Sequence, residues 1–360
     1  EHGDSRRYKV RSDGQYTPGV DFWEMGELDM GDPQTLVDLV NWARDNYPSD
    51  FYYLAVSNHG GGTRGIAWET YRTPGNITVP ELETALDAIA THNPDPVDVL
   101  HYDACLMSMI ELAYQLQDHA DHLIASENLG WSIFAYDRYI LQAADGPTPR
   151  VLAGRIASEY FAALPGYPRT IAAIDLALVG DVVNATSALA SSLTAALPAY
   201  ASEIAQARAA AQKLDSRDYL VIDDYDEYVD LYHLAQVIAQ HVPDPGIQAA
   251  AQNLIDTIGA VGGPFLVEEL HESGTYGPTY WDLDNAHGLS IYYPPNPDGW
   301  GYNEYLAGDL PFVGDTAWDE FLVAYYGELA LPPEVPVEPD LPPLLAPRFT
   351  VYLPFVTRGD

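Results

Sequence analysis

The stretch DVLHYDACLMSMIELAYQL, residues 98–116, decides the fold, and Cys105 at its centre is the only cysteine in the chain. Val97, Val99 and Leu100 belong to a short apolar run that is typical of a buried strand. Apolar residues then recur at helical spacing, at Leu106, Met109, Ile110, Ala113 and Leu116. We therefore expect a strand that ends, and a helix that begins, at Cys105.

This position would give Cys105 an unusual electrostatic environment. The free N–H groups and the positive end of the helix dipole lie at the amino end of a helix. They favour the thiolate, which is the form of cysteine that attacks carbon. A lone cysteine can equally be a small buried hydrophobic residue. Position alone leaves both interpretations open.

The composition limits the classes of function. With 360 residues, of which 47% are hydrophobic, the chain can bury a large core. Its net charge of −37 would repel nucleic acid and anionic membranes and attract cationic ligands, although an acidic surface also serves solubility. The chain has no run of about 18 apolar residues, which is the length that would predict a membrane span. The single cysteine excludes an intrachain disulfide.

The rest of the chain alternates strand and helix patterns. Such alternation predicts an α/β fold, with a mostly parallel sheet that helices cover on both faces. Asp32 followed by Pro33, and Thr78 followed by Glu81, are start signals of helices. Residues 1–30 are polar and show little strand character until DFWEMGELDMGDP, which begins at Asp21. Strands are expected within 51–57, 97–103, 122–131, 170–179, 263–273 and 287–294, and helices within 33–46, 80–92, 148–164, 180–213 (with a break near Pro198), 229–241, 246–259 and 318–329.

The character of the sequence changes near its end. We expect one catalytic-type domain in residues 1–328. Residues 329–347 are rich in proline and predict an extended, semi-rigid linker. Residues 348–360 add one apolar strand or tail.

His59 occupies a position like that of Cys105, because it follows the apolar run FYYLAVS, residues 51–57. The carboxyl ends of parallel strands meet at one edge of a sheet, where ligands bind. A histidine and a cysteine at that edge supply the base and the nucleophile of a cysteine peptidase. Gly60 permits close approach of a substrate carbonyl. The N–H groups of Gly60 and Cys105 could form an oxyanion hole.

Three other kinds of site fit less well. HGGG occurs in esterases, but the chain has no G-x-S-x-G nucleophile elbow. GGGTRG lacks the G-x-x-x-x-G-K-[ST] pattern of a phosphate loop. A zinc site at His101, Asp103, His119 and His122 would have neither a second cysteine nor an H-E-x-x-H motif.

The motifs SNHGGG, DACLMSMIE, YVDLYHLA and GLSIYYP together resemble the clostripain-like cysteine peptidases, family C11 of the caspase-like clan CD. The resemblance extends over most of residues 1–328. It implies a secreted cysteine endopeptidase with a caspase-like fold and peptide or protein substrates. It implies a catalytic dyad of His59 and Cys105, with Gly60 and Cys105 as oxyanion donors.

The resemblance also implies cleavage after arginine or lysine, with acidic residues that bind the basic side chain. Asp103 falls on one such position. Where relatives often read G-W-D, this chain has Gly130, Trp131 and Ser132. If the carboxylate replaced by Ser132 forms the pocket floor, a basic side chain would bind more weakly. Trp131 and Ser132 are therefore included among the expected substrate-binding residues.

Three further expectations follow from the resemblance. Family members cut themselves between the histidine and the cysteine, and Arg72 is the expected site here, with Arg64 as the other candidate. Some members require calcium, which the acidic cluster Asp223–Asp230 could bind; a solvated acidic loop is the alternative. Members usually open with an additional β–α unit. We expect that this first unit is missing from the sheet or lies on a separate N-terminal chain.

Two alternatives remain at this stage. In the first, the dyad serves a pocket with a preference for a neutral or acidic residue. The protein could also be a non-catalytic module whose acidic surface binds a cationic partner.

Overall fold

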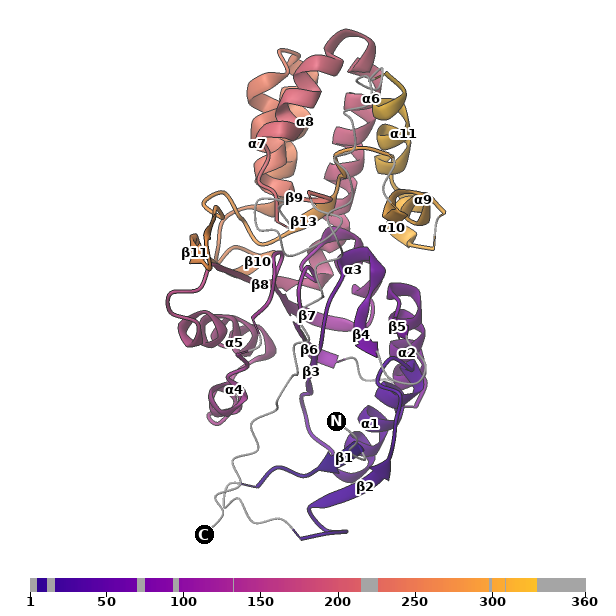
Figure 1. Cartoon of the computed structure of the whole chain (residues 1–360), viewed down its shortest axis with the longest axis vertical. Coiled ribbons are helices and arrows are strands. Elements are labelled where there is room, and N and C mark those ends of the chain that lie inside the picture. Colours follow the sequence, from indigo (N-terminus) through magenta and orange to yellow (C-terminus); the bar gives the residue numbers. More distant parts are fainter. Residues whose placement is uncertain are drawn as a thin grey trace.

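A mixed sheet of five strands lies at the centre of the protein (Figure 1). The computed structural model describes residues 5–11, 17–69, 75–92, 97–131, 133–214, 226–297, 300–307 and 309–328. The strand order is β10–β8–β7–β6–β3. The bounds are Tyr53–Ser57 for β3, Val97–Asp103 for β6, Ala120–Ala125 for β7, Arg169–Asp175 for β8 and Leu266–Glu272 for β10.

The directions of these strands confirm the prediction of a mostly parallel sheet. β3, β6 and β7 are parallel, whereas β8 is antiparallel to both of its neighbours. Four of the five strands therefore point the same way. Within the described residues β3 pairs only with β6, so it forms one edge of the sheet.

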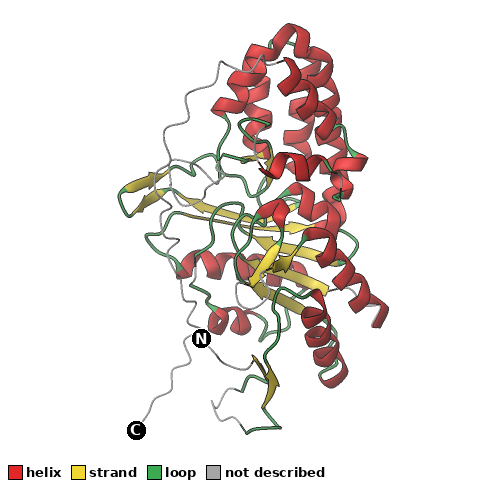
Figure 2. Cartoon of the chain, turned by 45° about the vertical axis from the view of Figure 1, so that its right-hand side comes forward, coloured by secondary structure: helices red, strands yellow, loops and turns green. Residues whose placement is uncertain are grey.

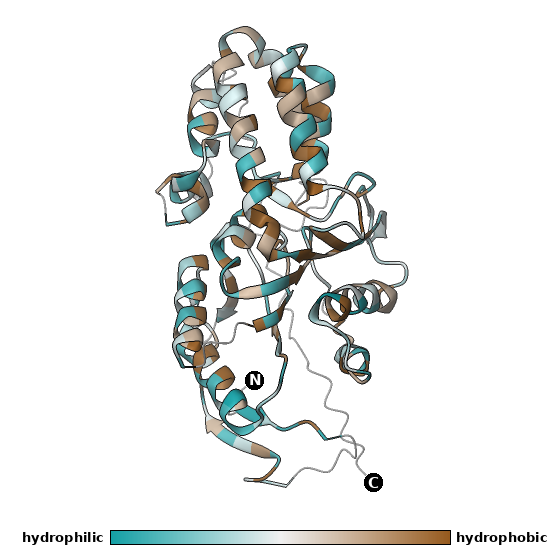
Figure 3. Ribbon diagram, turned by 180° about the vertical axis from the view of Figure 1, so that it is seen from behind, coloured by the Kyte–Doolittle hydropathy of each residue, from teal (hydrophilic) through white to brown (hydrophobic). Residues whose placement is uncertain are grey.

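Helices cover both faces of the sheet, as predicted (Figure 2). One face packs against α1 (Pro33–Asn46), α2 (Val79–His92), α3 (Ile110–Leu116) and α6 (Val179–Ala210). The other face packs against α4 (Tyr136–Gln142) and α5 (Pro149–Ala163). Figure 3 shows that the strands between these layers are among the most apolar parts of the chain.

Two helix starts confirm the signals in the sequence. Asp32 caps α1 by accepting a hydrogen bond from the backbone N–H of Gln34 (2.9 Å), with Pro33 in the first turn. At the start of α2, Glu81 accepts from the N–H of Thr78 (3.0 Å), and Thr78 Oγ1 accepts from the N–H of Glu81 (3.4 Å). These reciprocal bonds form the predicted capping box.

A second helical layer extends beyond the sheet at the top of Figure 1. It contains α6, α7 (Leu231–His241), α8 (Pro245–Ile258) and α11 (Trp318–Glu328), with the shorter α9 (Trp300–Leu306) and α10 (Pro311–Asp315) beside them. The predicted break in α6 lies at Tyr200, two residues after Pro198, where φ is −131° and ψ is 22°.

Among the described residues, one helical segment, Leu176–Ala210, is long and apolar enough to cross a membrane by length and composition alone. Half of its most apolar window is buried inside the protein. Buried residues such as Val182, Leu189 and Leu193 belong to the main core. The segment is therefore packed as a core helix.

Four two-stranded ribbons complete the fold. They pair β1 (Ser5–Tyr8) with β2 (Phe22–Gly26), β4 (Ile66–Glu69) with β5 (Gly75–Ile77), β9 (Tyr228–Asp230) with β13 (Ser290–Tyr292), and β11 (Gly274–Tyr276) with β12 (Thr279–Trp281). β1 contradicts the expectation of little strand before residue 21, whereas β2 lies in the stretch DFWEMGELDMGDP that was excepted. Cross-strand contacts such as the stacking of Tyr8 on Phe22 (5.6 Å between ring centroids) hold this first ribbon together.

Candidate active site

His59 and Cys105 follow two adjacent parallel strands. In the register of β3 and β6, Ser57 lies opposite Asp103. His59 comes two residues after Ser57, and Cys105 comes two residues after Asp103. The two side chains that could act as base and nucleophile therefore leave the sheet from neighbouring strand ends, at the same edge.

Cys105 lies in a half-buried position lined by backbone amides. The N–H of Gly130 donates a hydrogen bond to Sγ at 3.2 Å. Burial raises the pKa of the thiol, and the N–H groups of Gly130, Gly60 and Cys105 itself oppose this shift without cancelling it. The same amides that partly stabilise a thiolate could stabilise other negative charge at this point.

The prediction that a helix begins at Cys105 is wrong. A turn separates the two, and α3 begins at Ile110. Because the helix terminus lies five residues away, its dipole does not act directly at the sulfur. The expected bias towards thiolate is therefore not produced by the helix, and burial raises the thiol pKa instead.

Residues 126–128 hold the turn after Cys105 in place. The N–H of Leu106 donates to the carbonyl of Asn128 (3.0 Å), and the N–H of Met107 donates to that of Ser126 (2.9 Å). Leu106 has a φ of 62°, in the left-handed region that a leucine rarely adopts. Such a conformation costs about 1–2 kcal/mol, so the surrounding contacts must maintain it.

Gly60 makes the closest backbone contact between the two loops. A Cβ atom at this position would lie 2.2 Å from the carbonyl oxygen of Cys105 and 2.9 Å from Met107 Cγ. No side chain fits there without moving the cysteine loop. Glycine is therefore required at residue 60 because the carbonyl of Cys105 approaches it closely, whereas the expected approach of a substrate carbonyl stays a prediction.

The loop around His59 turns sharply through several glycines. The N–H of Ala67 donates to the carbonyl of His59 (3.1 Å), and the N–H of Gly61 donates to the carbonyl of Gly65 (3.0 Å). The His59 side chain is exposed at the edge of the sheet. The hydrogen bonds fix the backbone of the loop and leave the imidazole accessible to a ligand.

Asp103 is more enclosed than a binding-site carboxylate usually is. Its side chain is 0% exposed, and Oδ1 lies 3.0 Å from Nε2 of His101, which is also 0% exposed. Tyr53 Oη lies 2.7 Å from Nδ1 of the same histidine. Asp103 raises the pKa of the phenol of Tyr136, to which it is hydrogen-bonded, although burial raises it more. Asp103 therefore already has an internal partner.

The contact between Asp103 and His101 was not predicted from the sequence, although the spacing of the two residues indicated it. Alternate residues of a strand point to the same face. His101 and Asp103 are two apart on β6, so they had to be neighbours on the face that packs against α4 and α5. Gly130, whose N–H meets the sulfur, carried no comparable signal, because that contact depends on the tertiary fold.

Of the other expected site residues Trp131, Ser132 and Arg72, the structure describes Trp131. Trp131 is half-buried and stacks with Tyr276 and Trp281, at ring-centroid distances of 4.4 and 5.3 Å. Trp281 and Leu283 form a small cluster that Cys105 also contacts. Ser132 and Arg72 lie outside the described residues.

Arg64, the other cleavage candidate, is held by an ion pair with Glu227 (2.9 Å). In the described part of the chain, no group of three or more His, Cys, Asp or Glu residues could hold a metal ion. The considered zinc set of His101, Asp103, His119 and His122 therefore does not form a site. In the cluster proposed for calcium, Asp223, Asp224 and Tyr225 are not described, and Asp230 is buried and caps α7.

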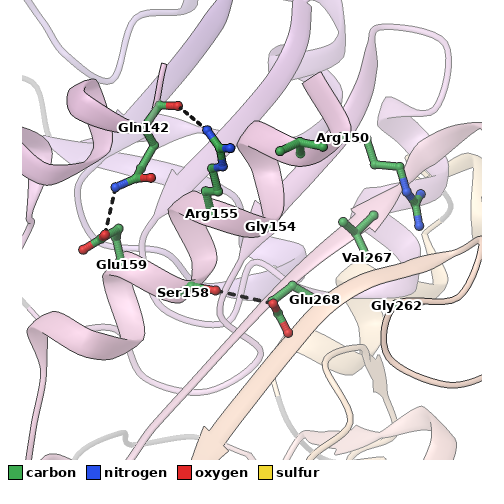
Figure 4. Close-up of a pocket in the computed structure, with 10 residues that line it drawn as sticks. Gln142, Arg150, Gly154, Arg155, Ser158, Glu159, Gly262, Val267 and Glu268 are labelled. Atoms are coloured by element: carbon green, nitrogen blue, oxygen red, sulfur yellow. Dashed lines mark hydrogen bonds between the residues drawn. The ribbon is translucent and has the colours of Figure 1, made fainter. Parts of the chain in front are cut away.

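A surface hollow of about 520 Å³ lies away from this edge, between α4, α5 and β10 (Figure 4). Its two arginines have partners: Arg150 lies 3.2 Å from Asp175, and Arg155 lies 2.8 Å from Asp145. It contains neither His59 nor Cys105. The hollow is therefore not part of the candidate active site.

Comparison with known proteins places this chain in a family. A sequence model of the Clostripain family, peptidase family C11, matches residues 2–325. The chain belongs to the clostripain family. The family expected from its motifs is confirmed, and the enzyme class of this family, cysteine peptidase, is the class that was expected.

One curated relative matches part of the chain. Clostripain of Hathewaya histolytica is 32% identical over 162 residues, an alignment that covers 38% of this chain and 30% of clostripain. The matched part therefore spans less than a third of the length of that relative.

Two solved structures confirm the caspase-like fold of the family. A secreted C11 cysteine protease from Bacteroides thetaiotaomicron, in complex with an irreversible peptide inhibitor, has a TM-score of 0.60 at 16% identity; the match covers 84% of this chain and 81% of that one. An inactive zymogen C11 protease from Parabacteroides distasonis has a TM-score of 0.57 at 18% identity, with 79% and 76% covered.

Proposed function

We propose that this chain is a cysteine endopeptidase that hydrolyses peptide bonds through His59 and Cys105. The observation that carries this proposal is the pair of strand ends, where a histidine and the only cysteine leave parallel neighbours at the same offset. Membership of the clostripain family supports it.

The first half of the reaction forms an acyl-enzyme. His59 accepts the thiol proton of Cys105 as Sγ attacks the scissile carbonyl carbon. The N–H groups of Gly60 and Cys105 donate to the oxyanion of the tetrahedral intermediate. As the C–N bond breaks, the imidazolium returns its proton to the leaving amine.

The second half releases the acid. His59 accepts a proton from water as the water oxygen attacks the thioester carbon. The C–S bond then breaks, the thiolate leaves, and the imidazolium restores its proton to it. Because burial raises the pKa of Cys105, we infer that proton transfer to His59 accompanies attack, with little free thiolate before substrate binds.

Substitution of each dyad residue tests the proposal. Cys105→Ala and His59→Ala should each lower kcat/KM on peptide substrates by at least 10³-fold. Wild-type rates in Cys105→Ala would refute it. A non-catalytic acidic module would instead leave Cys105 equally reactive towards a thiol probe in the native and denatured chains.

For specificity, we propose cleavage after arginine or lysine, with Asp103 as the residue that binds the basic side chain. A second candidate, preference for an uncharged side chain, is favoured by the contact of Asp103 with His101 (3.0 Å) in a fully buried position. A carboxylate that already has a partner binds a cation less strongly.

A peptide library with all residues at the position before the scissile bond separates these candidates. Preference for arginine would support the first, and preference for glutamine or alanine the second. Ser132→Asp should then raise the preference for arginine, because it adds a carboxylate where relatives often have one.

The other finer expectations also stand as proposals. We propose that the chain cuts itself after Arg72, that it is secreted, and that residues 329–347 and 348–360 are a linker and a terminal strand outside the peptidase domain. One structural relative is described as a zymogen, which supports the proposal of self-cleavage. The other is described as secreted, which supports the proposal of secretion.

Among the residues that the structure describes, β3 pairs only with β6, and this supports the proposal that a further strand, from a preceding segment or a separate N-terminal chain, completes the sheet. An unpaired strand edge promotes association of sheets. Calcium dependence stays a prediction, and activity measured after chelation and after return of calcium tests it.

A further inference from the structure

The ribbon of β9 and β13 lies outside the central sheet, yet it contacts both loops of the candidate active site. In its antiparallel register Tyr228 faces Tyr292, and Asp230 faces Ser290. These residues come from YVDLYHLA and GLSIYYP, two motifs that the proposed reaction leaves without a role. Tyr228, Asp230, Ser290 and Tyr292 are all buried.

On the cysteine side, the ribbon holds the segment just after Cys105. The N–H of Ser290 donates to the carbonyl of Ser108 at 2.9 Å, and Ser290 Oγ donates to the same carbonyl at 3.0 Å. In return, Ser108 Oγ donates to the carbonyl of Gly288 at 2.6 Å. Three hydrogen bonds thus join the end of the cysteine loop to β13 and the residues before it.

On the histidine side, one hydroxyl group holds the glycine turn. Tyr228 Oη accepts from the N–H of Thr63 at 3.1 Å and donates to the carbonyl of Gly61 at 3.2 Å. A Cβ atom on Gly62 would lie 2.4 Å from this hydroxyl, so the turn rests directly on the phenol. A single polar group therefore satisfies a donor and an acceptor of the turn after His59.

An ion pair reinforces this contact from the residue next to Tyr228. Arg64 Nη2 lies 2.9 Å from Glu227 Oε2, and the Glu227 side chain is only 6% exposed. The charge pair and the phenol hydroxyl act on residues 61–64 from two consecutive residues, Glu227 just before β9 and Tyr228 at its start. An interface held by packing alone would have neither this ion pair nor the hydrogen bonds of the phenol. Polar contacts therefore fix residues 61–64.

We propose that the β9–β13 ribbon fixes the position of the histidine loop relative to the cysteine loop, and that Tyr228 is a positioning residue for His59. The inference rests on the proposed function. The main sheet sets where the two strands end, but Gly60 to Arg64 lie beyond the ladder of β3 and β6. Beyond that point the two loops contact each other at Gly60, and the ribbon contacts both of them.

The test is Tyr228→Phe, which keeps the ring and removes the hydroxyl. We expect kcat to fall about tenfold, because the N–H of Thr63 loses its acceptor and the carbonyl of Gly61 loses one of its two donors, the other being the N–H of Arg64. KM should stay within about twofold, because the phenol does not touch substrate. Tyr326→Phe is the matched control, since Tyr326 on α11 also donates to a backbone carbonyl, that of Pro294.

A second readout separates positioning from a loss of stability. The rate of Cys105 alkylation by iodoacetamide is followed against pH in wild type, Tyr228→Phe and His59→Ala. If His59 assists the thiol, wild type should show a component of the alkylation rate at pH values below the pKa of the thiol. His59→Ala should lack this low-pH component, and Tyr228→Phe should weaken it. The melting temperatures of the same three proteins are also measured.

The outcomes are distinct. If Tyr228→Phe keeps kcat within twofold of wild type, or loses activity only in step with its melting temperature while its alkylation profile is unchanged, the positioning role is refuted. If wild type and His59→Ala have the same profile and the same kcat, the proposed dyad itself fails. A drop in kcat with a weakened low-pH component, and none in Tyr326→Phe, supports the inference.

Discussion

Gly60→Ala tests the contact between the two loops of the candidate active site in the most direct way. The new methyl carbon would lie 2.2 Å from the carbonyl oxygen of Cys105, 2.9 Å from Met107 Cγ and 3.0 Å from Ala104 Cβ. The first of these is a backbone atom, so it cannot turn away as the end of a side chain can. One of the loops must move.

The size of this movement gives the expected effect. Relief of the closest contact needs a shift of about 1 Å, and misplacement of that size costs about 10²-fold in rate. The shift also moves the N–H of residue 60 away from the oxyanion, and loss of one such donor costs about 10²–10³-fold in kcat. We expect kcat/KM to fall by about 10²–10³-fold.

The assay measures initial rates on a peptide substrate, with the melting temperature and the rate of Cys105 alkylation as checks on the fold. Gly154→Ala is the matched control. Its methyl carbon would lie 3.6 Å from Val267 Cγ1 and 3.8 Å from Glu268 Cβ, which are ordinary contacts, and α5 should gain up to about 1 kcal/mol in helix propensity. Activity of Gly60→Ala within threefold of wild type would refute the reasoning.

Three further predictions concern stability, processing and specificity. Burial raises the pKa of Glu111 from 4.5 to about 7, so the folded state holds a proton that the unfolded state has lost between these values. The free energy of unfolding should therefore fall by about 3 kcal/mol as pH rises through this window, and Glu111→Gln should remove that part of the slope in denaturant titrations; equal slopes would contradict this. Arg72→Ala should leave the chain intact during long incubation of active enzyme, whereas an intact wild-type chain under the same conditions would exclude self-cleavage at Arg72. His101→Leu should raise the kcat/KM ratio of arginine to glutamine peptides about tenfold if His101 neutralises Asp103, and an unchanged ratio would show that it does not.

Local signals in the sequence predicted much of the scaffold. Asp32 with Pro33, and Thr78 with Glu81, mark helix starts because their bonds involve residues only two or three positions away. The apolar runs before His59 and Cys105 identified two adjacent strands for the same reason. The family motifs then joined those strand ends into one candidate site.

Contacts between distant residues explain what the sequence could not predict. The turn after Cys105 replaces a helix start because Leu106 bonds to Asn128, which belongs to the loop after the next strand. A strand of three residues such as β9 has too few positions to show a period, whereas β13 lies within the strand expected at 287–294. Their role depends on Tyr228 and Ser290 reaching loops more than 160 residues away in sequence.

The late place of the β9–β13 ribbon in the chain has a consequence for synthesis. Ser290 follows Ser108 by 182 residues, and at about 5–20 residues per second the ribosome needs roughly 10–40 s to cover that distance. Throughout this interval the nascent chain carries both loops without the element that clamps them. A peptidase whose loops depend on this ribbon would gain activity only after the ribbon has been synthesised, well after the ribosome has made Cys105.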